Sequence, residues 1–339
     1  MQPSVAEIPE LAAIDPDTIR REVFGSGRPV ILRGLVSSWP SVDVSRRSPL
    51  ALVEYLRRFD NGTLVDAIMT PPEVEGRIFY DEAMNGFNFI RNRLPVGSIA
   101  EQVLRYSAFA RPPAVAVQSA LIESCLPGFV AENELSVLDG VQPRIWLGNA
   151  ITTPAHVDEW HNIGCVVSGR RRFTLFPPEQ IANLYIGPLD FAPTGAPMSL
   201  VKLHDPDFTR FPRFRQALAA AVSSELQPAD AIYIPPLWWH HVESLEPFNM
   251  LVNYWWHGEP LRALGATPGF DSLIHAILSL RQQSPATREA WRAVFNHFVF
   301  GADADVVAHI PEHRHGILGN VSDADVARLR AHLAERLRK

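Results

Sequence analysis

The chain has 339 residues, 47% of them hydrophobic, and a formal net charge of −6. This is enough to bury a large core in one large domain, or in a domain with an appendage. The charge and the lack of a long basic run disfavour a nucleic-acid partner. No run of about 18 apolar residues predicts a membrane span, and the N-terminus does not resemble a signal peptide. Two cysteines make no disulfide framework, so we expect a cytoplasmic protein.

The first hundred residues predict a mixture of helices and strands. Residues 18–24 predict a short helix, and the apolar run 29–34 predicts a strand. Ser48-Pro49 has the residue types of a helix start. Asn85-Gly86 lies between two aromatic runs and indicates a hairpin. Ser98 and the glutamate three residues later have the spacing of a capping box.

From about residue 114 to 257, short apolar runs alternate with turn residues. The runs lie at 115–117, 145–147, 163–167, 173–176, 232–234 and 250–254. Many short strands at this spacing are typical of an antiparallel barrel or sandwich, here interrupted by a predicted helix at 213–223. Helical patterns follow at 271–280, 285–300 and 323–337. We therefore predict a β-rich domain over 1–259, which includes the mixed N-terminal segment, and a helical region over 260–339.

The first candidate metal motif is His156-Val157-Asp158. On a strand, residues i and i+2 point to the same face, so this imidazole and carboxylate could bind one ion. Iron(II) oxygenases use two histidines and one carboxylate and leave the other positions open. The motif alone is weak, because His241-Val-Glu243 and His257-Gly-Glu259 have the same spacing.

The surrounding sequence identifies a family. Residues 153–177 read TPAHVDEWHNIGCVVSGRRRFTLFP, and residues 230–245 read DAIYIPPLWWHHVESL. Together they resemble the JmjC-type cupin oxygenases, in particular the branch that contains the asparaginyl hydroxylase acting on hypoxia-inducible factor. Residues 28–40, RPVILRGLVSSWP, resemble the opening segment of the same family. The resemblance runs from about residue 18 to 257. It implies a mainly β fold, a double-stranded β-helix (cupin or jelly-roll) core with flanking helices, followed by a helical C-terminal region.

The resemblance also implies a metal site and a reaction. The iron(II) ligands would be His156, Asp158 and His240. Strand alternation cannot choose between His240 and His241, whereas the family pattern selects His240 and leaves His241 to packing or to an outer shell. The implied reaction uses iron(II), 2-oxoglutarate and dioxygen to hydroxylate a C–H bond.

The cosubstrate residues follow from the same resemblance. A chelating 2-oxo acid leaves its far carboxylate in need of a cation and hydroxyl donors. Relatives usually provide a lysine in Gly-x-Lys-Arg, and here Arg171 stands at that position. Arginine can bind a carboxylate with two hydrogen bonds, although it is larger than lysine. Thr153 matches a threonine that binds the same carboxylate, Asn162 and Asn253 match asparagines that line the pocket, and Trp255 matches an aromatic residue near the iron.

One departure from the family leaves alternatives open. Relatives often carry a tyrosine whose hydroxyl reaches the cosubstrate, and the matching position here is Ala116. Gln118 or Tyr106 could take its place. Together with Arg171, this departure motivates a non-catalytic cupin that acts as a sensor or scaffold, or an oxidase that uses another oxo acid.

The resemblance implies partners as well. The substrate would be a protein or peptide side chain, with small molecules also possible. The helices after Pro260 resemble a region that pairs subunits in relatives, so we expect a homodimer. Histone demethylation is not favoured, because the sequence shows no zinc finger or chromatin-reading module.

Overall fold

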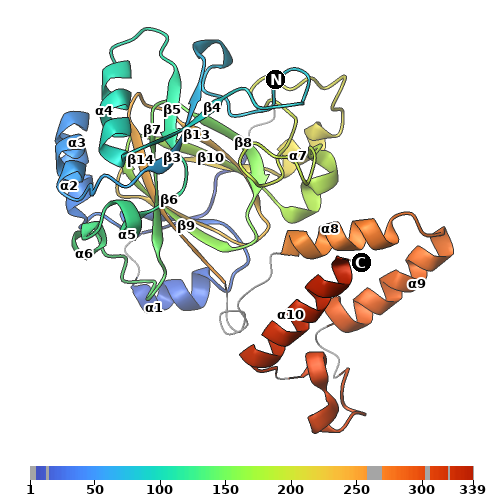
Figure 1. Ribbon diagram of the computed structural model, residues 1–339. Helices are drawn as coiled ribbons and strands as arrows, with labels where there is room; N and C mark the ends of the chain where they lie inside the picture. Colours follow the sequence, from blue (N-terminus) through green and yellow to red (C-terminus); the bar gives the residue numbers. More distant parts are fainter. Residues whose placement is uncertain (1–4, 13–14, 258–268, 302–305, 320, 339) are drawn as a thin grey trace. The chain divides into compact units, whose positions relative to one another are not determined.

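The computed structural model describes residues 5–12, 15–257, 269–301, 306–319 and 321–338 (Figure 1). The chain divides into two compact units, 1–256 and 257–339. Over the described ranges, every helix is too short or too polar to cross a bilayer.

The first unit is built mainly of strands. They are β1 (Glu10–Ala12), β2 (Val30–Arg33), β3 (Val65–Thr70), β4 (Ile90–Leu94), β5 (Ala114–Val117), β6 (Ala120–Leu121), β7 (Pro143–Gly148), β8 (Thr152–Val157), β9 (His161–Ser168), β10 (Arg171–Phe176), β11 (Val222–Leu226), β12 (Ala231–Ile234), β13 (Trp239–Ser244) and β14 (Asn249–Trp256). The helical elements are α1 (Pro16–Thr18), η1 (Ile19–Val23), α2 (Pro40–Arg47), α3 (Pro49–Arg57), η2 (Pro72–Val74), α4 (Val96–Tyr106), α5 (Ile122–Cys125), α6 (Phe129–Glu132), η3 (Pro178–Asn183) and α7 (Phe214–Ala220).

The strands form two sheets that pack on each other. The larger sheet has ten strands in the order β1-β2-β12-β9-β14-β7-β5-β3-β4, with β6 paired to β7. The smaller sheet has the order β11-β10-β13-β8. One buried cluster joins the two, because it contains Val166 and Leu251 from the larger sheet and Phe173 and Leu175 from the smaller. This arrangement confirms the predicted double-stranded β-helix with flanking helices.

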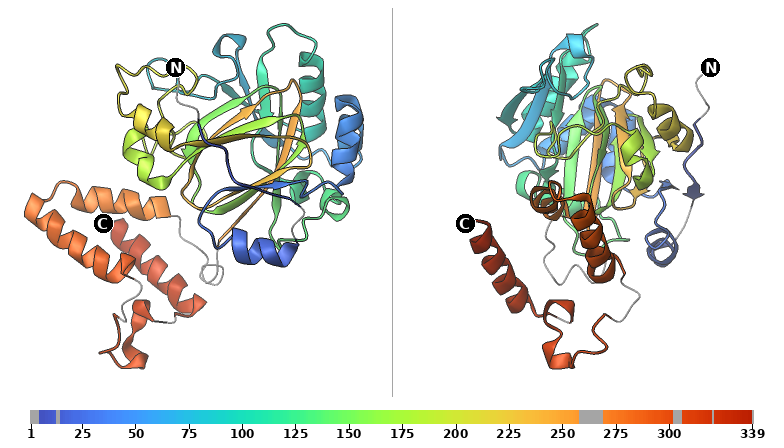
Figure 2. Two further views of the ribbon diagram at one scale, coloured as in Figure 1. Left: turned by 180° about the vertical axis from the view of Figure 1, so that it is seen from behind. Right: turned by 90° about the vertical axis from the view of Figure 1, so that its right-hand side faces the viewer.

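Alternation along the strands gives the larger sheet two different faces. Ile163, Cys165 and Val167 on β9 join a core cluster with residues of α2, α3 and α4, and these helices cover the outer face (Figure 2). The intervening Val166 faces the smaller sheet. Helix α7 packs against β10 of the smaller sheet. Both cysteines, Cys125 and Cys165, are buried free thiols, and both lie in this core cluster.

Where the sequence has a clear periodicity of apolar residues, the predicted helices and strands agree with those of the structure. Every apolar run predicted between residues 114 and 257 lies in a strand, and Ser48 caps α3 by accepting a hydrogen bond from the Ala51 amide. The capping box at Ser98 is wrong, because α4 begins at Val96 and Ser98 lies inside it. The hairpin at Asn85-Gly86 is reduced to a turn with one bridge, Tyr80 to Phe87.

The second unit is helical in its described parts. Its elements are α8 (Gly269–Leu280), α9 (Pro285–Phe295), η4 (Asn296–Phe300), η5 (Glu312–Arg314), η6 (Gly316–Leu318) and α10 (Asp323–Leu337). Ser322 caps α10 by accepting a hydrogen bond from the Asp325 amide, as its position predicts. The boundary drawn from the sequence, between residues 259 and 260, lies outside the described residues.

Candidate metal centre

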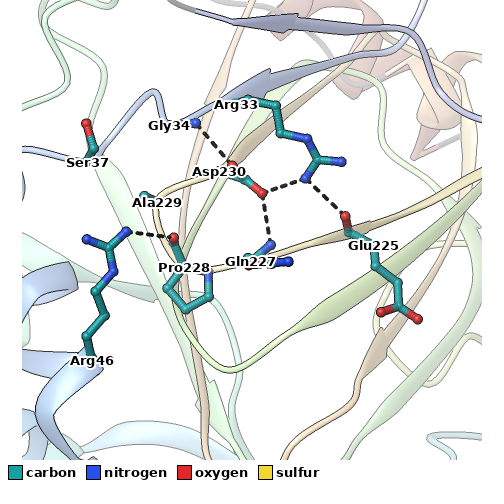
Figure 3. A pocket seen from close by; sticks show the side chains of 9 residues that line it. All are labelled: Arg33, Gly34, Ser37, Arg46, Glu225, Gln227, Pro228, Ala229 and Asp230. Atoms are coloured by element: carbon teal, nitrogen blue, oxygen red, sulfur yellow. Dashed lines mark hydrogen bonds and ion pairs between the residues drawn. The ribbon is translucent and has the colours of Figure 1, made fainter.

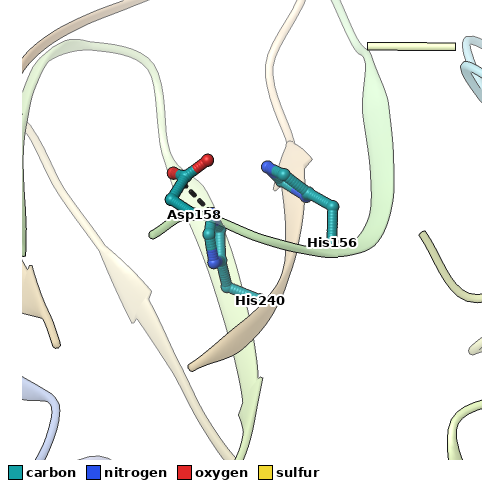
Figure 4. A group of neighbouring side chains, drawn as sticks. All are labelled: His156, Asp158 and His240. Atoms are coloured by element: carbon teal, nitrogen blue, oxygen red, sulfur yellow. Dashed lines mark ion pairs between the residues drawn. The ribbon is translucent and has the colours of Figure 1, made fainter. Parts of the chain in front are cut away.

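Two neighbouring strands of the smaller sheet bring His156, Asp158 and His240 together (Figure 4). His156 on β8 lies directly opposite His240 on β13, and Asp158 follows the end of β8. The ligand atoms that the three side chains offer all lie within 4.8 Å of one another. The His240 Nε2 atom is 3.5 Å from Asp158 Oδ2. Two imidazoles and one carboxylate converge, which is the ligand set of a mononuclear iron(II) oxygenase.

Backbone carbonyls orient both imidazoles. Nδ1 of His156 lies 3.0 Å from the Pro154 carbonyl oxygen, and Nδ1 of His240 lies 3.0 Å from that of Trp238. A carbonyl can only accept a hydrogen bond, so each Nδ1 carries the proton and each Nε2 keeps its lone pair for a metal. Burial, with the nearby His240, lowers the pKa of His156 to about 4. His156 is therefore neutral near pH 7, as a metal ligand must be.

The carboxylate is positioned by Trp255. The indole Nε1 of Trp255 donates a hydrogen bond of 3.1 Å to Asp158 Oδ2. Trp146 packs edge-on against Trp255, with ring centroids 6.0 Å apart. These contacts fix the direction in which Asp158 presents its oxygens.

We expect Trp255→Phe to weaken iron(II) affinity by about 10- to 100-fold, because it removes the hydrogen bond to Asp158 and keeps an aromatic ring. An anaerobic iron(II) titration measures the change. Trp256→Phe is the matched control, since Trp256 stacks on His161 and not on the carboxylate. Equal affinities in the two variants would show that Trp255 does not position Asp158.

A β-bulge brings Thr153 to the face of the sheet that carries His156. On β13, His240 pairs with His156, but Val242 pairs with Thr153, so the register shifts between them. Residues directly opposite each other in a ladder point to the same side. Thr153 and His156, three positions apart, therefore both face the larger sheet, which simple alternation forbids.

Arg171 lies on the same inner face, farther along the sheet. On β10, Leu175 pairs with His240 and Arg171 pairs with Ser244. These positions are four residues apart, or about 13 Å along the strand. Thr153, opposite Val242, lies between them. A five-carbon diacid chelated at the metal would extend past Thr153 towards Arg171.

The Arg171 guanidinium is a buried cation without a counter-charge. Its exposed fraction is 8%, its Nε has no hydrogen-bond partner, and no carboxylate among the described residues forms an ion pair with it. Burial lowers the pKa of Arg171 to about 10. A buried unpaired charge costs stability, and a bound carboxylate offsets that cost. Its neighbour Arg172 instead faces outward and binds Glu225.

The two asparagines belong to one hydrogen-bonded chain. Asn253 Nδ2 donates to Asn162 Oδ1 at 3.2 Å, and Trp146 Nε1 donates to Asn253 Oδ1 at 2.8 Å. Strand pairing places Arg144 opposite Asn253, and its guanidinium lies 5.8 Å from the Trp255 ring. Sequence reasoning missed Trp146 and Arg144. Their alternation with the apolar Ile145 and Leu147 is the signal that could have found them.

At the position where relatives often carry a tyrosine, this chain has Ala116 in apolar surroundings. Ala116 on β5 packs in a cluster with Ile68, Ile78, Ala114 and Ile151. Tyr106 does not take its place, because it packs on the core beneath the helices and its hydroxyl accepts a hydrogen bond from Gln102. Gln118 follows β5 and is half-buried. Neither Ala116 nor Tyr106 therefore offers the tyrosine hydroxyl that the resemblance implies for this position.

A surface pocket of about 420 Å³ lies away from these residues (Figure 3). Two of its charged groups pair with each other, since Asp230 accepts a hydrogen bond from Arg33 at 2.6 Å. Asp230 also accepts one from the Gly34 amide at 3.1 Å. It shares no residue with the candidate metal centre.

Comparison with known proteins agrees with the fold and the ligand set described above. The profile of the cupin-like domain matches residues 16–262. Jumonji C domain-containing protein 5 of Drosophila melanogaster is 29% identical over 268 residues, which cover 75% of this chain and 60% of that protein. HSPB1-associated protein 1 of Homo sapiens is 35% identical over 119 residues, covering 34% of this chain and 24% of that protein. Lysine-specific demethylase JMJ31 of Arabidopsis thaliana is 33% identical over 131 residues, covering 38% and 22%. In each case the match spans less than two thirds of the relative.

Proposed function

This chain belongs to the cupin-like family and has JmjC-type relatives, and on that premise we propose that it is an oxygenase that hydroxylates a C–H bond. JmjC-domain relatives are typically 2-oxoglutarate-dependent oxygenases. One observation carries the proposal. Two imidazoles of fixed orientation converge with Asp158, and a buried, unpaired Arg171 lies on the same inner face.

The residues of this chain fit iron(II) and 2-oxoglutarate. When bound by His156, Asp158 and His240, iron(II) supplies the redox chemistry that couples decarboxylation of 2-oxoglutarate by dioxygen to hydroxylation. Arg171 pairs with the far carboxylate, and the Thr153 hydroxyl donates to the same group. The inner apolar side chains keep bulk water from this end of the pocket.

Turnover of oxo acids tests the reaction. Iron(II)-loaded protein in air is expected to convert 2-oxoglutarate to succinate, and chromatography of the products measures it across a panel of 2-oxo acids. A clear preference for another oxo acid would support the altered-pocket alternative that Ala116 motivates. A protein that binds iron yet consumes no oxo acid would support the sensor or scaffold and contradict the proposed enzyme.

We propose a protein or peptide side chain as the substrate class. The names of a lysine-specific demethylase and of an HSPB1-associated protein among the relatives support it. Incubation with a tryptic peptide mixture under oxygen-18 gas tests it by mass spectrometry. A peptide that gains one oxygen-18 atom supports hydroxylation, whereas loss of a methyl group with release of formaldehyde identifies demethylation. Incorporation only into small molecules would contradict this class.

A cytoplasmic location stays a prediction.

A homodimer through the second unit is also part of the proposal. Leu278 and Phe300 are 76% and 72% exposed in that unit, and apolar side chains so exposed favour association. Size-exclusion chromatography with light scattering is expected to give twice the chain mass of 37.8 kDa, and Leu278→Glu with Phe300→Glu is expected to lower it to one chain. A wild-type monomer would contradict the prediction.

A further inference from the structure

A second group of ligating side chains lies on the opposite face of β13 from the candidate iron site. His241 and Glu243 alternate with His240 and Val242 along this strand. His204 comes from the segment between β10 and β11. One ligand atom from each of His204, His241 and Glu243 lies within 4.8 Å of the others. The candidate iron site uses none of these residues.

Two buried atoms in this group face each other without a hydrogen bond. His241 Nε2 and Glu243 Oε2 are 3.9 Å apart, and both are buried without a hydrogen-bond partner. The exposed fractions of these residues are 4% and 7%. A separation of 3.9 Å is too long for a hydrogen bond. Two donors about 2.0–2.2 Å from a tetrahedral ion lie about 3.4 Å apart, so a shift of about half an ångström would bring these two atoms to one ion.

His204 completes the group from the solvent side. Its Nε2 lies 2.5 Å from Glu243 Oε1, and its side chain is 55% exposed. The His204 and His241 rings are close to perpendicular, with centroids 6.0 Å apart.

We propose that His204, His241 and Glu243 bind a divalent transition-metal ion, zinc, as a second metal site. Two imidazoles and one carboxylate are a ligand set that zinc accepts, with water in the fourth position. Small movements of the exposed His204 side chain bring the three donors to one centre. The ion provides a partner for two buried atoms that have no hydrogen bond within the protein.

The charges around the site predict which metals bind. Arg172 Nη1 lies 3.7 Å from Glu243 Oε2, and the charge of Arg77 also acts on His241. These two guanidinium groups repel a cation, so they weaken the binding of an ion that is held by electrostatic attraction alone. Nitrogen ligands instead favour zinc over magnesium and calcium, which prefer oxygen. Zinc is therefore expected to bind in excess magnesium.

A bound ion would join the segment between β10 and β11 to β13. The same segment contacts β8, because Met198 forms a bridge with His156 and the Ser199 amide donates to the Ala155 carbonyl at 2.7 Å. The proposed zinc ion thus holds this segment over two strands that carry the iron ligands. Its role is structural, and it needs no part in oxygen chemistry.

Metal stoichiometry tests the proposal. Full-length protein is stripped with a chelator and dialysed against zinc in excess magnesium, and bound zinc is measured by mass spectrometry. His156→Ala removes the candidate iron site, so this variant is expected to bind one zinc ion per chain. His156→Ala with His204→Ala is expected to bind none, and exposed His204 can be replaced without opening the core. His156→Ala with Asp205→Ala, which changes the exposed neighbour of His204, is expected to keep the ion.

Cobalt(II) gives an independent signature, since a tetrahedral site with nitrogen ligands produces visible absorption bands. These bands are expected in His156→Ala and absent after the added His204→Ala change. Equal zinc binding by these two variants, or no zinc bound by His156→Ala alone, would overturn the proposal.

Discussion

His240→Ala is expected to weaken iron(II) binding by more than about 100-fold, since loss of a direct ligand exceeds the effect of an outer partner. The Nε2 atom of His240 faces Asp158 at 3.5 Å, and among the described residues no further histidine or carboxylate joins this group. Succinate formation is expected to fall with iron occupancy. Anaerobic iron titration and product analysis measure the two effects separately.

His241→Ala is the informative control for that experiment. Strand alternation leaves open which of the two adjacent histidines binds iron, whereas the ladder places His240 opposite His156. His241 faces the other way, near His204. Iron binding is expected to persist in His241→Ala, because His241 belongs to the second group of ligating side chains. If this variant loses iron while His240→Ala keeps it, the assignment of the ligands is wrong.

Arg171→Met is expected to raise the KM for 2-oxoglutarate by about 100-fold, because truncating one partner of a buried charge pair costs several kcal/mol. Iron(II) binding is expected to stay intact, since Arg171 lies about 13 Å along the strand from the residue opposite His240. Arg171→Lys, which restores the residue type usual in relatives, is expected to recover part of the affinity. Steady-state kinetics with varied 2-oxoglutarate measure both.

Thermal unfolding, measured with and without 2-oxoglutarate, distinguishes a loss of cosubstrate binding from a loss of stability. Without cosubstrate, wild-type Arg171 is a buried cation that pairs with no carboxylate in the described part of the chain, so Arg171→Met is expected to be no less stable. Addition of 2-oxoglutarate is expected to raise the Tm of iron-loaded wild type but not of the variant. Arg170→Met is the control, because Arg170 is exposed and pairs with Glu225 and Glu246. An unchanged KM in Arg171→Met would remove Arg171 from the cosubstrate site.

Strand periodicity made most of the β fold predictable. The runs around Ile163–Val167 and Phe173–Phe176 are apolar enough to identify strands on their own. The turn between them is equally local, because Gly169 has a φ of +72°, which glycine adopts easily. Strand β11 (Val222–Leu226) was missed, because serines and a glutamate weaken its apolar pattern and the predicted helix at 213–223 included its first two residues.

The candidate site was only partly predictable from local patterns. His156 and Asp158 form a short motif, but His240 lies far along the chain and was selected by family resemblance. The placement of Thr153 depends on a bulge between paired strands, and pairing cannot be read from one strand. The His241-Val-Glu243 motif was visible in the sequence, but its completion by His204 was not, because His204 reaches it from a separate segment.

The most direct test of the proposed enzyme is an anaerobic titration of metal-free protein with iron(II) and then 2-oxoglutarate, followed by visible absorption spectroscopy. We expect a metal-to-ligand charge-transfer band in the wild type and no band in His156→Ala. Iron binding without a band would contradict the proposed binding of 2-oxoglutarate. No iron binding by the wild type would contradict the metal centre itself.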